Sequence, residues 1–244
     1  MNKFRLFIAV QIFSVFTIQH TQAFQQEPSK IDRKAVVTRH NITITDRNLK
    51  GPSQVGNGEF AFGMDLTGLQ TFVPFNTMSH WGWESAPLPA GRRIEDFHGQ
   101  MVETHGRRVR YPLPDPQQPE LSQWLAGNPH RINLGRLGLV LTKRDGTPAV
   151  QADVTDTRQE LDLWTGIVTS HFSVEGQPVT VTTACHPKRD EIAVRLQSPL
   201  IAAGRLAVLL AFPGDDTRQF ANFVGDWDHQ AVDRTRLVPS GRNP

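Results

Sequence analysis

Apolar side chains recur at every second position over much of the chain from Ile31 onward. Ile42 and Ile44 alternate with polar neighbours, and the run from Phe60 to Leu66 follows the same rule. Successive side chains of an extended strand point to opposite faces, so each of these segments presents one apolar face. The pattern predicts strands with one buried side and few helices.

The second half of the chain predicts a connected series of strands. A leucine-rich strand over 132–142 is followed by Asp145-Gly146, a dipeptide that favours a tight hairpin turn, so a return strand is expected near 149–154. Further on, the alternating segments 168–174 and 179–185 flank a short turn and predict a second hairpin.

Two more strands complete the series. The segment 192–196 is apolar on one side only, whereas 206–212 is apolar on both sides and is expected at the centre of a sheet. Regularly spaced strands with turns between them are typical of an all-β fold built from antiparallel sheets. We therefore predict a large antiparallel β-sandwich.

One segment, 73–130, departs from the strand pattern. It is rich in proline, which cannot donate a hydrogen bond to a sheet ladder. Its aromatic residues, among them Trp81, Trp83 and Trp124, indicate order, because disordered segments are usually poor in aromatic side chains. The expected structure is one long, packed loop inserted into the sandwich.

The N-terminus has the order of a secretory signal peptide. Lys3 and Arg5 precede an apolar run over 6–18, and small residues follow at Thr21-Gln22-Ala23. The run is shorter than the roughly 20 residues that a membrane-spanning helix needs. We expect cleavage after Ala23, a flexible N-terminus over 24–30, and export to the periplasm or the outside of the cell. The alternative is a buried N-terminal helix.

Composition sets broad limits on the mature chain. Removing 23 of the 244 residues leaves 244 − 23 = 221, enough for a single sandwich domain over 31–213. The only cysteine, Cys185, excludes an intramolecular disulfide. Net charge is +2 with both signs interspersed, which gives no indication of a nucleic-acid partner.

The stretch Gly56-Asn57-Gly58-Glu59-Phe60-Ala61 matches a loose dinucleotide-binding pattern, but a strand follows it where that pattern requires a helix. We interpret it as a turn in which the glycines adopt positive φ and Asn57 caps the chain. No cofactor is expected. Neither metal-ligand spacing nor a Gly-x-Ser-x-Gly elbow is present, so we assign no metal site and no catalytic residue.

The candidate binding segment is the tryptophan cluster within 77–84. Indole faces pack against apolar patches of sugars while neighbouring polar groups bind the hydroxyls. The alternative is that the tryptophans anchor the loop to the sandwich, and the sequence leaves both open. The substrate-binding candidates are Ser79, His80, Trp81, Trp83 and Glu84.

Two motifs and a longer stretch resemble a known domain. The motifs are Gln54–Phe60 and Leu161–Gly166, and the stretch 179–198 contains His186-Pro187 and Asp190. In this order they resemble the N-terminal super-sandwich domain of six-hairpin glycosidases, the group around glycoside hydrolase families 65 and 95. The motif residues carried over as structural are Gly56, Asn57, Gly58, Leu161, Asp162 and Leu163.

The resemblance implies a fold and a partner. In those families the super-sandwich precedes an (α/α)6 barrel that carries the catalytic carboxylates, so 214–244 is expected to be a truncated segment leading toward such a barrel. The implied function is that of a non-catalytic domain of an exported glycoside hydrolase or phosphorylase acting on oligosaccharides. The alternative is a stand-alone exported module that binds carbohydrate or has a structural role at the cell surface. Neither a nucleic acid nor, after signal cleavage, a membrane is an expected partner.

Overall fold

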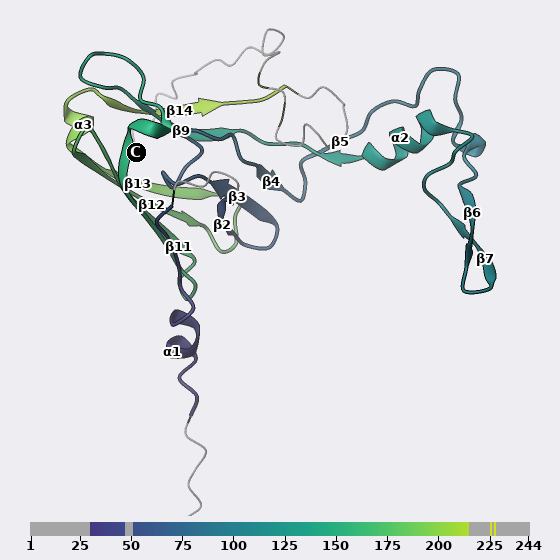
Figure 1. Cartoon of the computed structure of the whole chain (residues 1–244), viewed down its shortest axis with the longest axis horizontal. Helices are drawn as coiled ribbons and strands as arrows, with labels where there is room; N and C mark the ends of the chain where they lie inside the picture. The colour runs from purple at the N-terminus through teal and green to yellow at the C-terminus, as the bar shows by residue number, and fades with distance from the viewer. Residues whose placement is uncertain (1–29, 47–50, 215–224, 226, 228–244) are drawn as a thin grey trace, which may run out of the picture.

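The computed structural model describes residues 30–46, 51–214, 225 and 227, and these are mostly β-strands in several antiparallel sheets (Figure 1). The predicted all-β sandwich is therefore confirmed. The expected signal segment 1–23, residues 24–29 and nearly all of 214–244 lie outside the described residues. No helix in the described part is both long and apolar enough to cross a bilayer.

The larger layer of the sandwich is a five-stranded antiparallel sheet in the order β1-β10-β11-β12-β13. The hairpin expected over 168–185 and the one-sided strand at 192–196 are both present in it. The strands of this sheet are β1 (Ile42–Ile44), β10 (Val154–Asp162), β11 (Ile167–Val174), β12 (Gln177–Cys185) and β13 (Ile192–Gln197).

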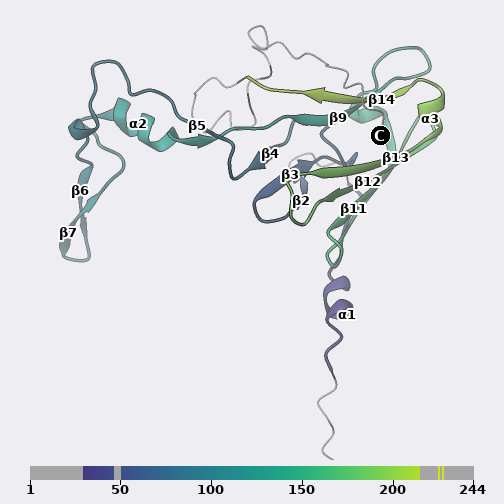
Figure 2. The same cartoon turned by 180° about the vertical axis from the view of Figure 1, so that it is seen from behind.

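Two small sheets pack against the large one, as seen from both sides in Figures 1 and 2. The first has the order β2-β3-β4, and in the second β9 pairs with β14. Their strands are β2 (Ser53–Gly56), β3 (Phe60–Met64), β4 (Thr77–Ser79), β9 (Arg136–Leu141) and β14 (Leu206–Ala211). The helix α3 (Pro199–Ala202) connects β13 to β14.

The core lies between these layers and follows the strand alternation. On β11, Val168 and Phe172 are buried, and Phe172 faces the buried Val179 of β12 across the ladder. Each fully buried aliphatic or aromatic side chain contributes about 1.5–3 kcal/mol relative to exposure. The opposite layer supplies Phe62 and Met64 from β3, together with the leucines Leu139 and Leu141 from β9.

The return strand predicted near 149–154 is wrong. After the turn at Asp145-Gly146 the chain makes an isolated bridge between Thr142 and Pro148, then the 3-10 helix η2 (Gln151–Asp153), and β10 begins directly after it. Two backbone hydrogen bonds flank this bridge, from the Lys143 N–H to the Thr147 carbonyl and from the Ala149 N–H to the Leu141 carbonyl, and the pairing ends where the chain enters η2. The strand that pairs with β9 is instead β14, more than sixty positions further along the chain.

The central position predicted for 206–212 is also wrong within the described residues, where β14 pairs with β9 alone. Val208 and Leu210 lie opposite Leu139 and Leu137, and so share the side of the sheet that faces the core. They are nevertheless 53% and 63% exposed, whereas Leu206 at the start of the same strand is buried.

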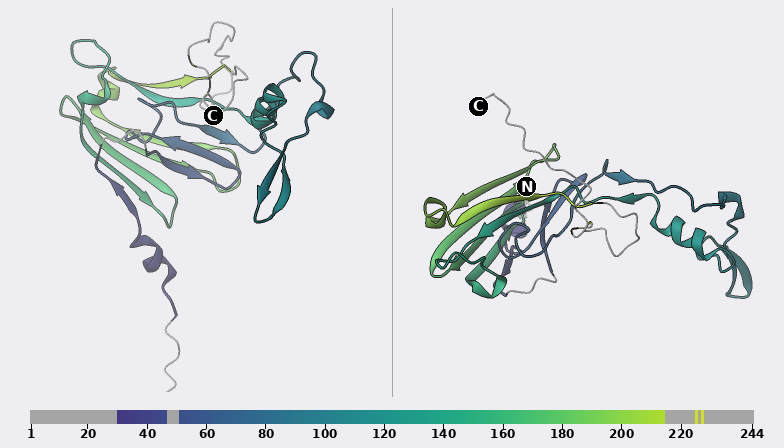
Figure 3. Two further views of the ribbon diagram at one scale, coloured as in Figure 1. Left: turned by 45° about the vertical axis from the view of Figure 1, so that its right-hand side comes forward. Right: turned by 90° about the horizontal axis from the view of Figure 1, so that it is seen from above.

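The prediction of one long loop over 73–130 is wrong, because this segment has strands and a helix of its own. Its residues 86–129, here called the arm, project away from the sandwich in two views (Figures 1 and 3). The short pair β5 (Trp83–Glu84) and β8 (His130–Arg131) joins the arm to the sandwich. The arm contains η1 (Ile94–Asp96), the hairpin of β6 (Gln100–Thr104) and β7 (Arg107–Tyr111), and the helix α2 (Pro119–Gly127).

A buried carboxylate organises the arm. Asp115 accepts hydrogen bonds from the backbone N–H groups of His98 (2.8 Å) and Gly99 (3.1 Å), while its own N–H donates to the Ser122 hydroxyl on α2. Leu121 of the same helix is fully buried. Pro119 stands at the start of α2, where its missing N–H costs nothing. The proline-rich segment is thus an ordered unit with its own small core.

One further helix, α1 (Arg33–Thr38), precedes β1 and has no buried residue. The side chain of Asp32 caps it by accepting a hydrogen bond from the N–H of Ala35 at 3.0 Å. In Figures 1 and 2 it extends away from the end of the sandwich.

Candidate functional site

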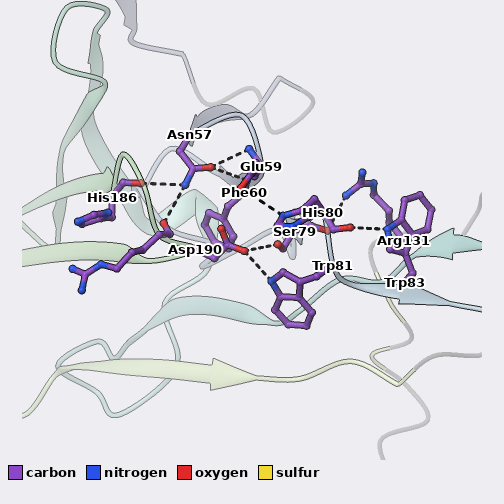
Figure 4. Close-up of polar contacts among 11 residues, drawn as sticks. Asn57, Glu59, Phe60, Ser79, His80, Trp81, Trp83, Arg131, His186 and Asp190 are labelled. Carbon is purple, nitrogen blue, oxygen red and sulfur yellow. Dashed lines mark hydrogen bonds and ion pairs between the residues drawn. The ribbon is translucent and has the colours of Figure 1, made fainter.

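Three segments far apart in the sequence meet at one edge of the sandwich (Figure 4). They are the turn between β2 and β3, the segment 79–83 that runs from the end of β4 to the start of β5, and the turn between β12 and β13. The meeting brings the first motif of the resemblance, the tryptophan cluster, and the turn containing His186 and Asp190 into contact.

The first segment is the turn that Asn57 caps. The side-chain Oδ1 of Asn57 accepts hydrogen bonds from the N–H groups of Glu59 (3.0 Å) and Phe60 (2.9 Å). Gly58 has a φ of 97°, a conformation that favours glycine. The prediction of positive φ does not hold for Gly56, which lies in β2. A glycine is required there because a Cβ would be 2.5 Å from the Phe60 carbonyl oxygen. Because β3 follows the turn, it has no helix N-terminus to hold a pyrophosphate.

Asn57 also joins this turn to the β12–β13 turn. Its Nδ2 donates to the backbone carbonyl of His186 at 3.2 Å and to that of Arg189 at 3.1 Å. One amide therefore fixes two turns whose sequences are more than 120 residues apart. The residue that this arrangement positions is Asp190, next to Arg189.

Asp190 receives two side-chain hydrogen bonds from the tryptophan segment. The hydroxyl of Ser79 donates to Asp190 Oδ2 at 2.5 Å, and the indole Nε1 of Trp81 donates to the same oxygen at 2.8 Å. The Ser79 bond chiefly, followed by the Trp81 bond and the charge of His80, holds the pKa of Asp190 below its usual range. The carboxylate is therefore ionised at neutral pH.

Trp83 is held by a different set of contacts. Its Nε1 donates to the backbone carbonyl of His80 at 2.6 Å, and the guanidinium of Arg131 lies 4.5 Å from the centroid of its ring. Arg131 also donates through Nη1 to the Ser79 carbonyl at 2.8 Å. A cation over an indole face is attracted by the ring quadrupole, so Arg131 helps to fix the orientation of Trp83.

The candidate residues differ in exposure. Ser79 is buried, so it acts by holding Asp190, while Trp81 is 60% and Trp83 48% exposed. His80 is also exposed, and its Nδ1 is 3.9 Å from Glu59 Oε2. Glu84 is half-buried on β5, opposite His130. Both indoles are thus anchored through their ring N–H groups while much of each ring reaches the surface.

A pocket of about 400 Å³ opens beside this cluster. The capped turn forms one wall, and Met78, His80 and Arg131 form another. Its lining combines apolar residues with a few charged or titratable groups, which is the mixture found where small ligands bind.

The second motif, Leu161–Gly166, serves a different purpose. It forms the turn between β10 and β11, where the Asp162 carboxylate accepts from Trp164 N at 3.0 Å and from the Thr165 hydroxyl at 2.7 Å. The N–H of Leu163 donates to Asn41 Oδ1 at 3.0 Å. These bonds stabilise the hairpin and its junction with the segment before β1, and none of them involves the tryptophan segment.

The sequence prediction of this site was incomplete. The sequence marks Asp190 only as part of a motif and gives no reason to select Arg131. Asp190 is 109 positions from Trp81 along the chain, and Arg131 is 48 from Trp83, so no local spacing indicates either contact. In the described part of the chain, no three His, Cys, Asp or Glu side chains lie together where they could hold a metal ion.

Comparison of the chain with protein-family models, with curated proteins and with solved structures finds no match.

Proposed function

We propose that this chain is the non-catalytic β-sandwich domain of an exported carbohydrate-active enzyme, and that it contacts oligosaccharides through Trp81 and Trp83. The observation that carries the proposal is that these two indoles are fixed by hydrogen bonds and yet exposed. Each has its N–H hydrogen-bonded to the protein and about half or more of its surface exposed. Ionised and polar groups surround them.

This arrangement matches what a sugar requires. The C–H patches of a pyranose ring pack on an aromatic face, and its hydroxyls need donors and acceptors at the rim of that face. An indole that is already fixed loses little conformational freedom when it binds, so more of the contact energy appears as affinity. The pocket beside His80 and Arg131 gives room for a neighbouring sugar unit.

The proposed partner is an (α/α)6 barrel that carries the catalytic carboxylates, as the resemblance to six-hairpin glycosidases implies. In this proposal the barrel cleaves or transfers the glycosidic bond by hydrolysis or phosphorolysis. The sandwich holds part of the oligosaccharide through the tryptophan segment. The two domains then divide binding and chemistry between them.

The test is to measure the affinity of neutral oligosaccharides for the purified chain by isothermal titration calorimetry. Trp81→Ala and Trp83→Ala are each expected to weaken binding about tenfold, the loss of one stacking contact. Trp164→Ala is the matched control, because Trp164 is 48% exposed like Trp83 but lies in the β10–β11 turn. It is expected to leave binding unchanged.

Two results would contradict the proposal. The first is the absence of binding by the unmodified chain to every oligosaccharide of a broad panel. The second is a loss of thermal stability in Trp81→Ala and Trp83→Ala with no change in affinity, which would make both tryptophans anchors of the segment.

A further inference from the structure

We infer that Asp190 determines the specificity of this site: its carboxylate binds hydroxyls of a neutral sugar stacked on Trp81 and disfavours uronic acids. The inference rests on the proposed function, which it deepens by naming the class of saccharide and the residue that selects it.

The first step is the free side of the carboxylate. Asp190 is exposed, and both of its side-chain hydrogen bonds, from Ser79 and from Trp81, go to Oδ2. No hydrogen bond from any described residue reaches Oδ1. A carboxylate oxygen has two acceptor positions, so Oδ1 is available for hydroxyl donors from outside the protein.

The second step is its position relative to the ring. The Trp81 Nε1–Oδ2 bond of 2.8 Å places the carboxylate at the edge of an indole that is 60% exposed (Figure 4). A sugar whose apolar face lies on this ring directs its hydroxyls outward, past the ring edge. At the Nε1 edge the first acceptor that such a hydroxyl meets is Asp190.

The third step is rigidity. Asn57 holds the carbonyls of His186 and Arg189, and the buried Ser79 holds the carboxylate itself. The acceptor is thus fixed by the protein before any ligand arrives. Preorganised groups bind with less loss of entropy than mobile ones.

The fourth step is charge. A hydroxyl that donates to an ionised carboxylate makes a charge-assisted bond, about twice as strong as a neutral one. The carboxylate of a uronic acid is instead repelled. The cationic groups around Asp190 have contacts of their own: Arg189 pairs with Glu191 at 3.0 Å, Arg131 is engaged with Trp83 and the Ser79 carbonyl, and the His80 ring lies 3.9 Å from the Glu59 carboxylate. They are therefore less available to neutralise a uronate.

The test compares neutral glucose, xylose and mannose oligosaccharides with oligogalacturonate on the wild-type chain and on Asp190→Asn. The wild type is expected to prefer the neutral ligands. Asp190→Asn keeps an oxygen that can accept from Ser79 and Trp81, but it removes the charge and replaces the free acceptor with an NH2 group. It is expected to weaken neutral binding about tenfold and to reduce the preference over oligogalacturonate.

Asp145→Asn is the matched control, since it makes the same substitution at an exposed carboxylate that also accepts two hydrogen bonds, both from Thr147, in the turn after β9. It is expected to change affinity less than about twofold. Near-ultraviolet circular dichroism checks that the tryptophans of each variant keep their native environment. The wild-type comparison of neutral and acidic ligands stands even if Asp190→Asn does not fold.

The outcomes separate the two proposals. Binding that depends on Trp81 but is unaffected by Asp190→Asn would overturn the inference and leave the proposed function standing. Tighter binding of oligogalacturonate than of neutral ligands by the wild type would do the same. If no saccharide binds the wild type at all, both proposals fail.

Discussion

Asn57 shows how one side chain can hold a site together. It accepts two backbone hydrogen bonds within its own turn and donates two to the β12–β13 turn, which uses the full donor capacity of its amide. Each such bond contributes modestly to stability, but losing all four at once also releases the turn that carries Asp190.

Asn57→Ala is therefore expected to lower the free energy of unfolding by about 2–3 kcal/mol, which urea denaturation measures. Asn41→Ala is the comparison, because the Asn41 side chain accepts one backbone hydrogen bond, from Leu163, and makes one further bond to the Asp162 carboxylate. It is expected to cost about half as much. Equal losses of unfolding free energy in the two variants would show that the bonds of Asn57 to the β12–β13 turn add no stability.

The lowered pKa of Asp190 predicts that the stability of the fold depends on pH. Since its folded pKa lies below the ordinary value of 3.8, the folded state favours the ionised carboxylate. Its stabilisation is complete well above pH 3.8 and is lost as pH falls through the folded pKa, because protonation removes the charge that strengthens the hydrogen bonds from Ser79 and Trp81.

The measurement is the Tm of wild type and Asp190→Asn between pH 7 and pH 2.5. Asp115, Asp145 and Asp162 also have lowered pKa values, so both proteins lose stability in acid and only the difference between them reports Asp190. That difference is expected to be constant above about pH 5 and to shrink below pH 4. A constant difference throughout would contradict the assignment.

At the scale of the elements, β9 and β14 form one ladder with unequal burial. Leu139 and Leu210 both point to the core side of this sheet, yet Leu139 is buried and Leu210 is largely exposed. The packing of the facing layer, and not the strand pairing, decides how much each side chain contributes.

Leu139→Ala is accordingly expected to lower the free energy of unfolding by about 2–5 kcal/mol. Leu210→Ala, the same substitution on the neighbouring strand, is expected to cost less than about 1 kcal/mol. Chemical denaturation of both variants checks this. Similar losses would mean that Leu210 is covered in solution.

At the scale of the whole molecule, the arm and the sandwich have separate cores. The main core draws its side chains from 55–72 and 134–206 and from none of the arm residues 86–129, while Leu121 is buried within the arm. The two ends of the arm meet, since the N–H of Ala86 donates to Asn128 Oδ1 at 2.6 Å.

Replacing 88–126 with a short Gly/Ser linker is therefore expected to leave the sandwich folded, with a cooperative thermal transition and a Tm within a few degrees of the intact chain. Because Trp81 and Asp190 lie outside the arm, saccharide binding is expected to survive as well. Calorimetry of the shortened chain measures both. Loss of cooperative unfolding would show that the arm supports the sandwich.

The site was only partly predictable. The capped turn at Asn57 follows from local composition, since turn preferences depend on near neighbours. The sequence left open whether the tryptophans are exposed or anchor the segment, and only the structure shows that both indoles are about half or more exposed. The bonds of Asp190 to Ser79 and Trp81 join residues about 110 positions apart, and no periodicity encodes such a distance.

Sequence alone located most strands of the sandwich, among them β3, β11, β12 and β13, and therefore determined that the fold is an all-β sandwich. These properties are set by the two-residue period of the extended backbone. The sequence misplaced β10 and missed the strands within 73–130. Only the tertiary structure decided that β9 pairs with β14, that the proline-rich segment is an ordered arm, and that Asp190 meets Trp81. Those outcomes depend on which distant surfaces bury one another, and that is a property of the packed chain as a whole.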